Sequence, residues 1–206
     1  MPRVSRSEAQ RNHAAIRRAS AALLRQQGLK VSVADIMAAA GLTPGGFYGH
    51  FGSKDELLAS GCAVAFEESA QRWASRVAAA PDAPTARAAL IDAYLAAEGP
   101  VVSGCPIAAL ATDVAREPAD RPVRRAFGAG LEKLLAILAA QQGAAGPAAR
   151  EAALLQLSAM VGALTLARAT RASELSGEFL EVVRRRLGAP PPARRGARRP
   201  RRRRPG

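Results

Sequence analysis

The sequence predicts an all-α protein, and its composition, periodicity and turn signals support this prediction. Of the 206 residues, 49% are hydrophobic, many of them Ala or Leu, and only 4% are aromatic. Alanine and leucine favour helices, whereas sheets are rich in β-branched and aromatic residues. Apolar residues recur every three or four positions, and no alternating strand pattern of any length occurs. Turn signals divide the chain into about nine helices.

The charge of the chain favours an acidic partner. The formal net charge is +13, and nucleic acid is the leading partner of such basic proteins. Eight of these charges are arginines within residues 194–206, which leaves +5 for the rest of the chain. Evidence for nucleic-acid binding must therefore come from the part of the sequence before this tail.

Several classes of protein are disfavoured by what the sequence lacks. Two cysteines and two histidines without ligand spacing predict no disulfide framework and no metal site. The sequence shows no phosphate-binding glycine loop and no nucleophile elbow, so we expect neither a cofactor nor catalytic residues. It shows no signal peptide and no run of 18 apolar residues, so we expect a cytoplasmic, nucleoid-associated protein with no membrane partner.

Four capping signatures mark helix starts in the first third of the chain. They are Ser7-Glu8-Ala9-Gln10, Ser32-Val33-Ala34-Asp35, Thr43-Pro44 and Ser53-Lys54-Asp55-Glu56. The first predicts a helix from about Glu8 to Gln27 that ends at Gly28. The second predicts a short helix that ends at Gly41, the third a very short helix, and the fourth a long amphipathic helix.

Two short helices separated by about three residues are typical of a helix-turn-helix motif. Residues 43–51 are too polar and too rich in glycine for a core helix, and they fit a helix end that enters a DNA major groove. Tyr48 and His50 would reach phosphates or base edges. Lys54 opposes the helix dipole in the first turn of the next helix, which indicates a nearby phosphate. Phe47 and Phe51 share one face and are predicted to pack.

A structural alternative remains for the same residues. Gly45-Gly46 would then be a loop, Tyr48 a half-buried packing residue and His50 a solvated side chain. The order of the helices alone does not decide between these interpretations.

The joint pattern is more specific than any one of its parts. The segment SVADIMAAAGLTPGGFYGHFGSKDELL, residues 32–58, resembles the DNA-binding domain of the TetR family of bacterial transcription regulators, over about residues 10–66. The resemblance implies a DNA-binding domain at 1–66 with the motif at about 32–51. It implies DNA contacts by Ser32, Val33, Thr43, Pro44, Gly45, Gly46, Tyr48, His50 and Lys54. Many members carry Thr or Ser where this chain has Gly46, so we expect specificity to rest more on backbone approach and DNA shape.

Turn signals divide the remainder into five further helices. The signals are at 81–84, 99–100, 117–118 and 143–147. They predict helices over about 85–98, 106–116, 121–142, 148–171 and 173–187. The long fourth helix would join the DNA-binding domain to this C-terminal helical domain at 67–188, and we expect 189–206 to be a disordered Pro/Arg-rich tail.

The family resemblance implies that the C-terminal domain binds a ligand and dimerises. Candidate pocket residues are Phe66, Trp73, Tyr94, Cys105, Leu110, Phe127 and Met160, and their few charges favour a small hydrophobic effector. Candidate dimer residues on the last two helices are Leu157, Val161, Leu164, Phe179 and Val183. The alternative for both sets is burial in the core of one subunit.

The sequence therefore predicts a homodimeric repressor that leaves a palindromic double-stranded DNA operator when a small effector binds. An activator of the same fold and a non-specific DNA-coating protein that uses the basic tail are the alternatives. Cys105 lies at a predicted helix N-terminus, where the dipole lowers a thiol pKa. It is either a redox-sensing thiol or a small buried residue. The tail is either an arm that adds phosphate contacts or a dispensable extension.

Overall fold

A computed structural model describes residues 5–96 and 104–188, and within these ranges every regular element is a helix. The predicted all-α class is confirmed. The tail at 189–206 and the predicted break at Gly99-Pro100 lie outside the described residues. The elements are α1 (Arg6–Gln27), η1 (Gly28–Lys30), α2 (Val33–Ala39), η2 (Pro44–Gly49), α3 (Lys54–Ala78), α4 (Ala83–Tyr94), α5 (Pro106–Arg116), α6 (Pro122–Ala139), α7 (Gly146–Ala169) and α8 (Glu174–Arg186).

The predicted helix starts at Ser32 and Ser53 are confirmed by their capping hydrogen bonds. Asp35 N donates to Ser32 Oγ over 3.0 Å, and Glu56 N donates to Ser53 Oγ over 3.1 Å. The Glu56 carboxylate in turn accepts from the backbone N–H of Gly52. These side chains satisfy amide groups that a helix leaves without an internal partner.

The predicted start of the first helix was wrong by two residues. Ser5, not Ser7, is the N-cap: its Oγ accepts from Glu8 N over 3.2 Å, and α1 begins at Arg6. Both serines have a Glu or Gln three residues later, so the capping pattern alone did not distinguish them. The end of α1 at Gln27 is as predicted, with Gly28 at φ +69°.

Two more predicted ends differ from the structure. Helix α4 ends at Tyr94 rather than near Glu98, and α6 ends at Ala139 rather than Gln142. At the end of α6 the Gln142 side chain donates to the carbonyl of Leu138. This side-chain bond satisfies a terminal carbonyl that another helical turn would otherwise have satisfied.

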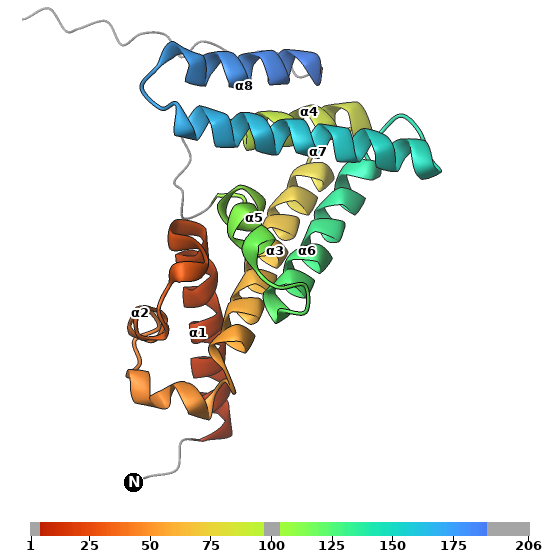
Figure 1. The fold of residues 1–206 in the computed structure, drawn as a ribbon. Helices are drawn as coiled ribbons and strands as arrows, with labels where there is room; N and C mark the ends of the chain where they lie inside the picture. The colour runs from red at the N-terminus through yellow and green to blue at the C-terminus, as the bar shows by residue number, and fades with distance from the viewer. Residues whose placement is uncertain (1–4, 97–103, 189–206) are drawn as a thin grey trace, which may run out of the picture.

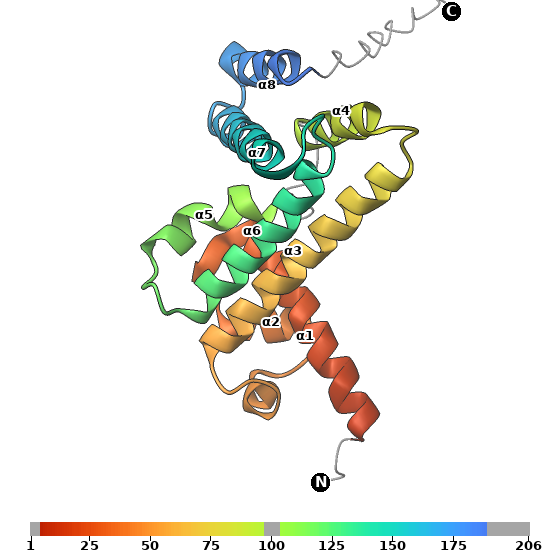
Figure 2. The same cartoon turned by 90° about the vertical axis from the view of Figure 1, so that its right-hand side faces the viewer.

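Helix α3 is the axis of the molecule. Figure 1 shows α3 and α6 running side by side in the same direction, with α1, α2 and η2 at one end and α7 and α8 at the other, and Figure 2 shows the same pairing from the side. Ion pairs between Asp55 and Arg121, 2.6 Å, and between Glu67 and Lys133, 2.6 Å, follow this register. The two helices approach closely where Gly130 lies against Phe66. One continuous hydrophobic core extends along α3, past the expected boundary at residue 66.

Candidate nucleic-acid interface and internal cavity

A tight turn sets η2 against α2. Leu42 N donates to Met37 O, and Gly41 adopts φ +73° between the two helices. Glycine adopts this left-handed conformation without the steric cost that a side chain brings. The turn therefore brings the short helices together as the helix-turn-helix pattern predicted.

The element predicted to be the recognition helix is a 3₁₀ helix, Pro44–Gly49. Thr43 holds the N-cap position but makes no side-chain capping bond. Phe47 and Phe51 are buried with ring centroids 6.2 Å apart, which confirms that they pack. Tyr48 is 81% exposed, so the alternative in which it is a half-buried packing residue is wrong.

The predicted DNA-contact residues gather on α2, η2 and the start of α3. Thr43, Pro44, Gly45, Gly46 and Lys54 are exposed with Tyr48, and Ser32, Val33 and His50 are partly buried. A Cβ atom added to Gly45 or Gly49 would meet no atom within 4 Å. The backbone at these two glycines is therefore open to the approach of a large partner.

Sequence reasoning missed the contribution of His13. Its ring stacks on Phe51 at a centroid distance of 4.7 Å and lies 6.5 Å from the ring of His50. The stack places α1 beside η2, so the exposed Arg6 and Arg11 of α1 flank the same end of the molecule. The only sequence signal for this contribution was the basic character of the first helix.

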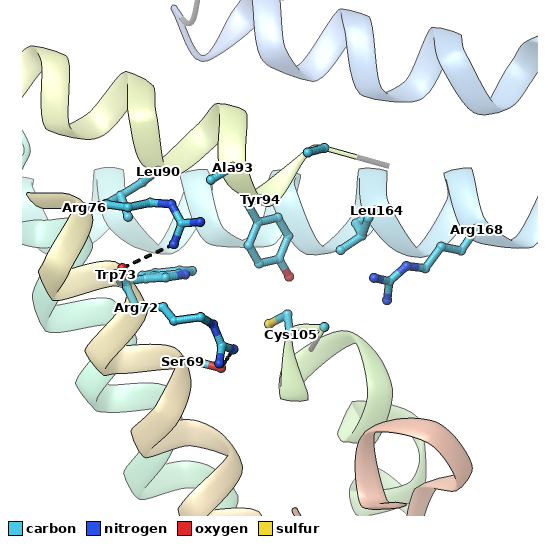
Figure 3. A pocket seen from close by; sticks show the side chains of 12 residues that line it. Ser69, Arg72, Trp73, Arg76, Leu90, Ala93, Tyr94, Cys105, Leu164 and Arg168 are labelled. Carbon is cyan, nitrogen blue, oxygen red and sulfur yellow. Dashed lines mark hydrogen bonds between the residues drawn. The ribbon is translucent and has the colours of Figure 1, made fainter. Parts of the chain in front are cut away.

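A cavity of about 240 Å³ lies between α3, α4, α7 and the start of α5 (Figure 3). Its lining comprises Ser69, Arg72, Trp73, Arg76, Leu90, Ala93, Tyr94, Ala96, Gly104, Cys105, Leu164 and Arg168. Three arginines in this lining overturn the expectation of a pocket with few charges. Arg72 donates to Ser69 Oγ over 2.9 Å, and Arg76 donates to the carbonyl of Arg72.

Only three of the predicted pocket residues line this cavity, namely Trp73, Tyr94 and Cys105. The other four, Phe66, Leu110, Phe127 and Met160, belong to the core instead. Phe66, Leu110 and Met160 are at most 1% exposed, and Phe127 packs edge-on against Phe66. Their apolar character suits both positions, so the sequence did not separate core from cavity.

Burial raises the pKa of the Cys105 thiol. The N–H groups of Ile107 and Ala108 at the start of α5 favour the thiolate, as the dipole argument expected, but burial outweighs them. Burial, followed by the neighbouring Cys105, also raises the pKa of Tyr94. The Tyr94 hydroxyl lies beside this thiol but makes no hydrogen bond of acceptable geometry to any described residue. A thiol in this state is a weak nucleophile at neutral pH, which disfavours the redox-sensor hypothesis.

The predicted dimer residues divide between the interior and the surface of α7 and α8. Leu157 and Leu164 are 5% and 3% exposed and face the interior of the subunit, whereas Val161, Phe179 and Val183 are partly buried. The residues that expose large apolar side chains on these helices are Leu154, Leu155, Leu166, Leu175 and Val182. Helix α7 is also long and apolar enough to cross a membrane, although its inner face packs on α6 and α8. We call Leu154, Leu155, Leu166, Leu175 and Val182 the outer apolar face.

The architecture defines a helix-turn-helix protein with an attached helical domain. Residues 16–60 match the family model for bacterial regulatory proteins of the tetR family. Residues 16–60 therefore resemble the DNA-binding region of this family, and the described chain has the fold of TetR-family transcriptional regulators.

Solved structures extend this similarity over most of the chain. A TetR transcriptional regulator from Chloroflexus aurantiacus is 25% identical, with a TM-score of 0.71 over 88% of this chain and 96% of that one. A TetR-family regulator from Agrobacterium tumefaciens is 22% identical, with a TM-score of 0.71 over 86% and 98%. The reduced form of Escherichia coli NemR is 17% identical, with a TM-score of 0.69 over 84% and 94%. No curated protein matches the chain.

Proposed function

We propose that the protein is a homodimeric repressor that binds a palindromic operator and leaves it when a small molecule occupies the cavity. The observation that carries this proposal is the placement of an exposed η2 at one end of the molecule and the outer apolar face at the other (Figure 1). One short recognition element reads few base pairs, so a two-fold pair of them supplies useful affinity.

Tyr48 and Lys54 are the side chains best placed to bind the phosphate backbone. Tyr48 extends from η2 with 81% of its surface exposed, and Lys54 is exposed at the start of α3. Ser32, Val33, Thr43, Pro44, Gly45, Gly46 and His50 complete the proposed contact surface. The glycines let the η2 backbone approach the groove, so shape contributes to specificity.

Selection of binding sites from random duplex DNA tests the DNA part of this proposal. A palindromic motif is the expected result, and Tyr48→Phe and Lys54→Gln should weaken binding to it. Loss of one phosphate contact per subunit should reduce the slope of log K against log salt by about 0.9 for each contact. Lys133→Gln is the matched control, because Lys133 lies on α6 and pairs with Glu67. Absence of a motif, with affinity that depends only on residues 189–206, would favour the DNA-coating alternative.

The outer apolar face supports the homodimer. Leu155 of α7 is 71% exposed, and Val182 of α8 is 44% exposed. Large apolar side chains exposed on two helices that pack together favour an interaction site. Leu155→Glu should shift the protein to a monomer in sedimentation velocity and weaken operator binding, whereas Ala129→Glu, at an exposed position of α6, should leave the dimer intact. A monomeric wild-type protein at micromolar concentration would contradict the proposal.

We expect repression rather than activation, because a dimer that occupies the operator would block transcription. A transcription reporter tests this expectation. Deletion of the gene should raise expression from a promoter that carries the selected palindrome. A fall in expression would identify an activator of the same fold.

A further inference from the structure

The cavity concentrates positive charge from elements that are far apart in the sequence. Arg72 and Arg76 come from successive turns of α3, and Arg168 comes from the end of α7 (Figure 3). The described residues of the lining include no Asp or Glu. Within the described chain no carboxylate pairs with Arg168. Glu68 lies near Arg72 and offsets part of its charge, so Arg168 contributes most to the attraction of an anionic group.

The start of α5 adds a second feature that favours an anion. Cys105 is its N-cap residue, and no side-chain capping bond is made there. The N-terminus of this 11-residue helix therefore places the positive end of its dipole beside the cavity, where the N–H groups of Ile107 and Ala108 are directed at the Cys105 thiol.

The Tyr94 side chain is an independent feature of the cavity that favours a polar ligand group. Its side chain is only 8% exposed, yet its hydroxyl has no hydrogen-bond partner among the described residues. In Figure 3 this hydroxyl points toward the Cys105 side chain, and Arg168 lies farther along the same cavity. A buried hydroxyl without a partner costs stability, and an acceptor atom in the cavity would relieve that cost.

We propose that the effector is a small amphipathic acid whose carboxylate or phosphate binds among Arg72, Arg168 and the Tyr94 hydroxyl. Its apolar body would lie against Trp73, Leu90 and Leu164, which form the apolar part of the lining. This inference rests on the proposed function, because it names the class of ligand for the same regulatory cavity. The volume of about 240 Å³ is just below the usual range for ligand sites, which limits the acid to a small one.

Two further observations are consistent with this ligand class. Burial, followed by the charge of Arg25, lowers the pKa of Arg72 despite the opposing charge of Glu68, so a further anion beside Arg72 would raise this pKa. Trp73 is the only tryptophan of the chain and lies in the cavity lining, so its fluorescence reports directly on occupancy.

Fluorescence titration of the full-length protein with three probes tests the proposal. The probes are phenylacetate, phenyl phosphate and the neutral phenylacetamide, at constant ionic strength. We expect at least one acid to bind tenfold or more tightly than the amide, and the better of the two acids identifies the head group. Equal affinities, or no response to either acid, would overturn the proposal.

Substitution of Arg168 separates specific recognition from general electrostatics. Arg168→Gln should weaken acid binding about tenfold or more without changing the affinity for the amide, and Arg168→Lys should retain part of the preference. Arg171→Gln removes the same charge from an exposed position just beyond α7 and should have no effect. Acid affinity that is unchanged in Arg168→Gln would overturn the proposal.

Operator binding, measured in the same samples, distinguishes failure of the ligand class from failure of the regulatory function. Acid binding without a change in operator affinity would support the ligand class and refute release by that ligand. Release of the operator by phenylacetamide alone would refute the ligand class and leave the regulator intact.

Discussion

The contact between α3 and α6 makes Gly130 the most informative position for a stability test. A Cβ atom at Gly130 would lie 2.6 Å from Phe66 Cβ and 2.6 Å from its Cδ2, closer than such atoms can approach. Phe66 is 1% exposed, and its ring packs edge-on against Phe127 with centroids 5.2 Å apart. The phenyl group therefore has no free space into which to rotate, and Gly130→Ala should force α3 and α6 apart.

The expected magnitude follows from two opposing effects. Overpacking a core costs about 1–3 kcal/mol, whereas Ala in place of Gly in a helix gains roughly 0.5–1 kcal/mol. The difference of these ranges is roughly 0–2.5 kcal/mol, and because the added Cβ atom would collide with the enclosed Phe66 ring, the net loss for Gly130→Ala should be about 1–2 kcal/mol. For a chain of this size each kcal/mol lowers the melting temperature by about 2–4 °C.

Gly128 provides the matched control on the same helix. It is exposed, and an added Cβ atom would meet nothing within 4 Å. Gly128→Ala should therefore stabilise the protein by roughly 0.5–1 kcal/mol. Urea unfolding followed by circular dichroism at 222 nm, at one protein concentration, measures both variants. A Gly130→Ala protein as stable as wild type would refute the close α3–α6 contact.

Three further predictions concern the cavity, the DNA surface and the junction between them. Burial raises the pKa of Cys105, and it raises that of Cys62 to about 12, so both thiols should react slowly with iodoacetamide at pH 7.5. The rate of Cys105 labelling should rise about tenfold for each pH unit above 7.5. Fast labelling at neutral pH would contradict this prediction. A threonine fits at position 46, because an added Cβ atom would meet only Met37 Cε at 3.7 Å. Gly46→Thr should therefore change the selected operator motif, while the melting temperature stays within about 2 °C of wild type. Leu29 N donates to the Asp113 carboxylate over 2.9 Å. Asp113→Ala should therefore speed hydrogen exchange at the Leu29 amide by tenfold or more. Thr112→Ala, at an exposed neighbouring position, should leave this exchange rate unchanged.

Local signals made the N-terminal third predictable. Serine caps, Pro44 at the first helical position and Gly41 in the turn each act within a few residues, so the sequence specifies them directly. The 3₁₀ form of η2 was not predictable in the same way. Its glycines leave the local helix type undecided, and the packing of Phe47 and Phe51 on the core fixes it.

The cavity and the outer apolar face depend on contacts between distant residues. Arg72 of α3 and Arg168 of α7 line the same cavity only because of the tertiary fold, and nothing in the spacing of either helix shows this. Helix α7 is apolar on most of its circumference, so its periodicity did not identify which leucines face inward. The structure places Leu157 inside and Leu155 outside, and these residues are only two positions apart.

Helix α5 connects the cavity to the DNA-binding region. Its first residues adjoin the cavity at Cys105, and near its other end Asp113 accepts the hydrogen bond from Leu29 in η1. Gly28 at φ +69° allows this close approach, since a Cβ atom there would collide with the Asp113 carboxylate. An α-helix of 11 residues is about 16 Å long and moves as a rigid unit.

If the proposed anion binds at the start of α5, it would act on the position of η1 through one rigid element. The ligand changes operator affinity only to the extent that it binds one position of α5 better than another. The hydrogen bond between Leu29 and Asp113, near the far end of α5, could be made in one position of α5 and broken in another. A hydrogen bond between an amide and a carboxylate can be exchanged for bonds to water at a net cost of about 1.5–3 kcal/mol, whereas separating α3 from α6 at Gly130 would break a packed core. Movement should therefore concentrate between α5 and η1, while α3 and α6 move together.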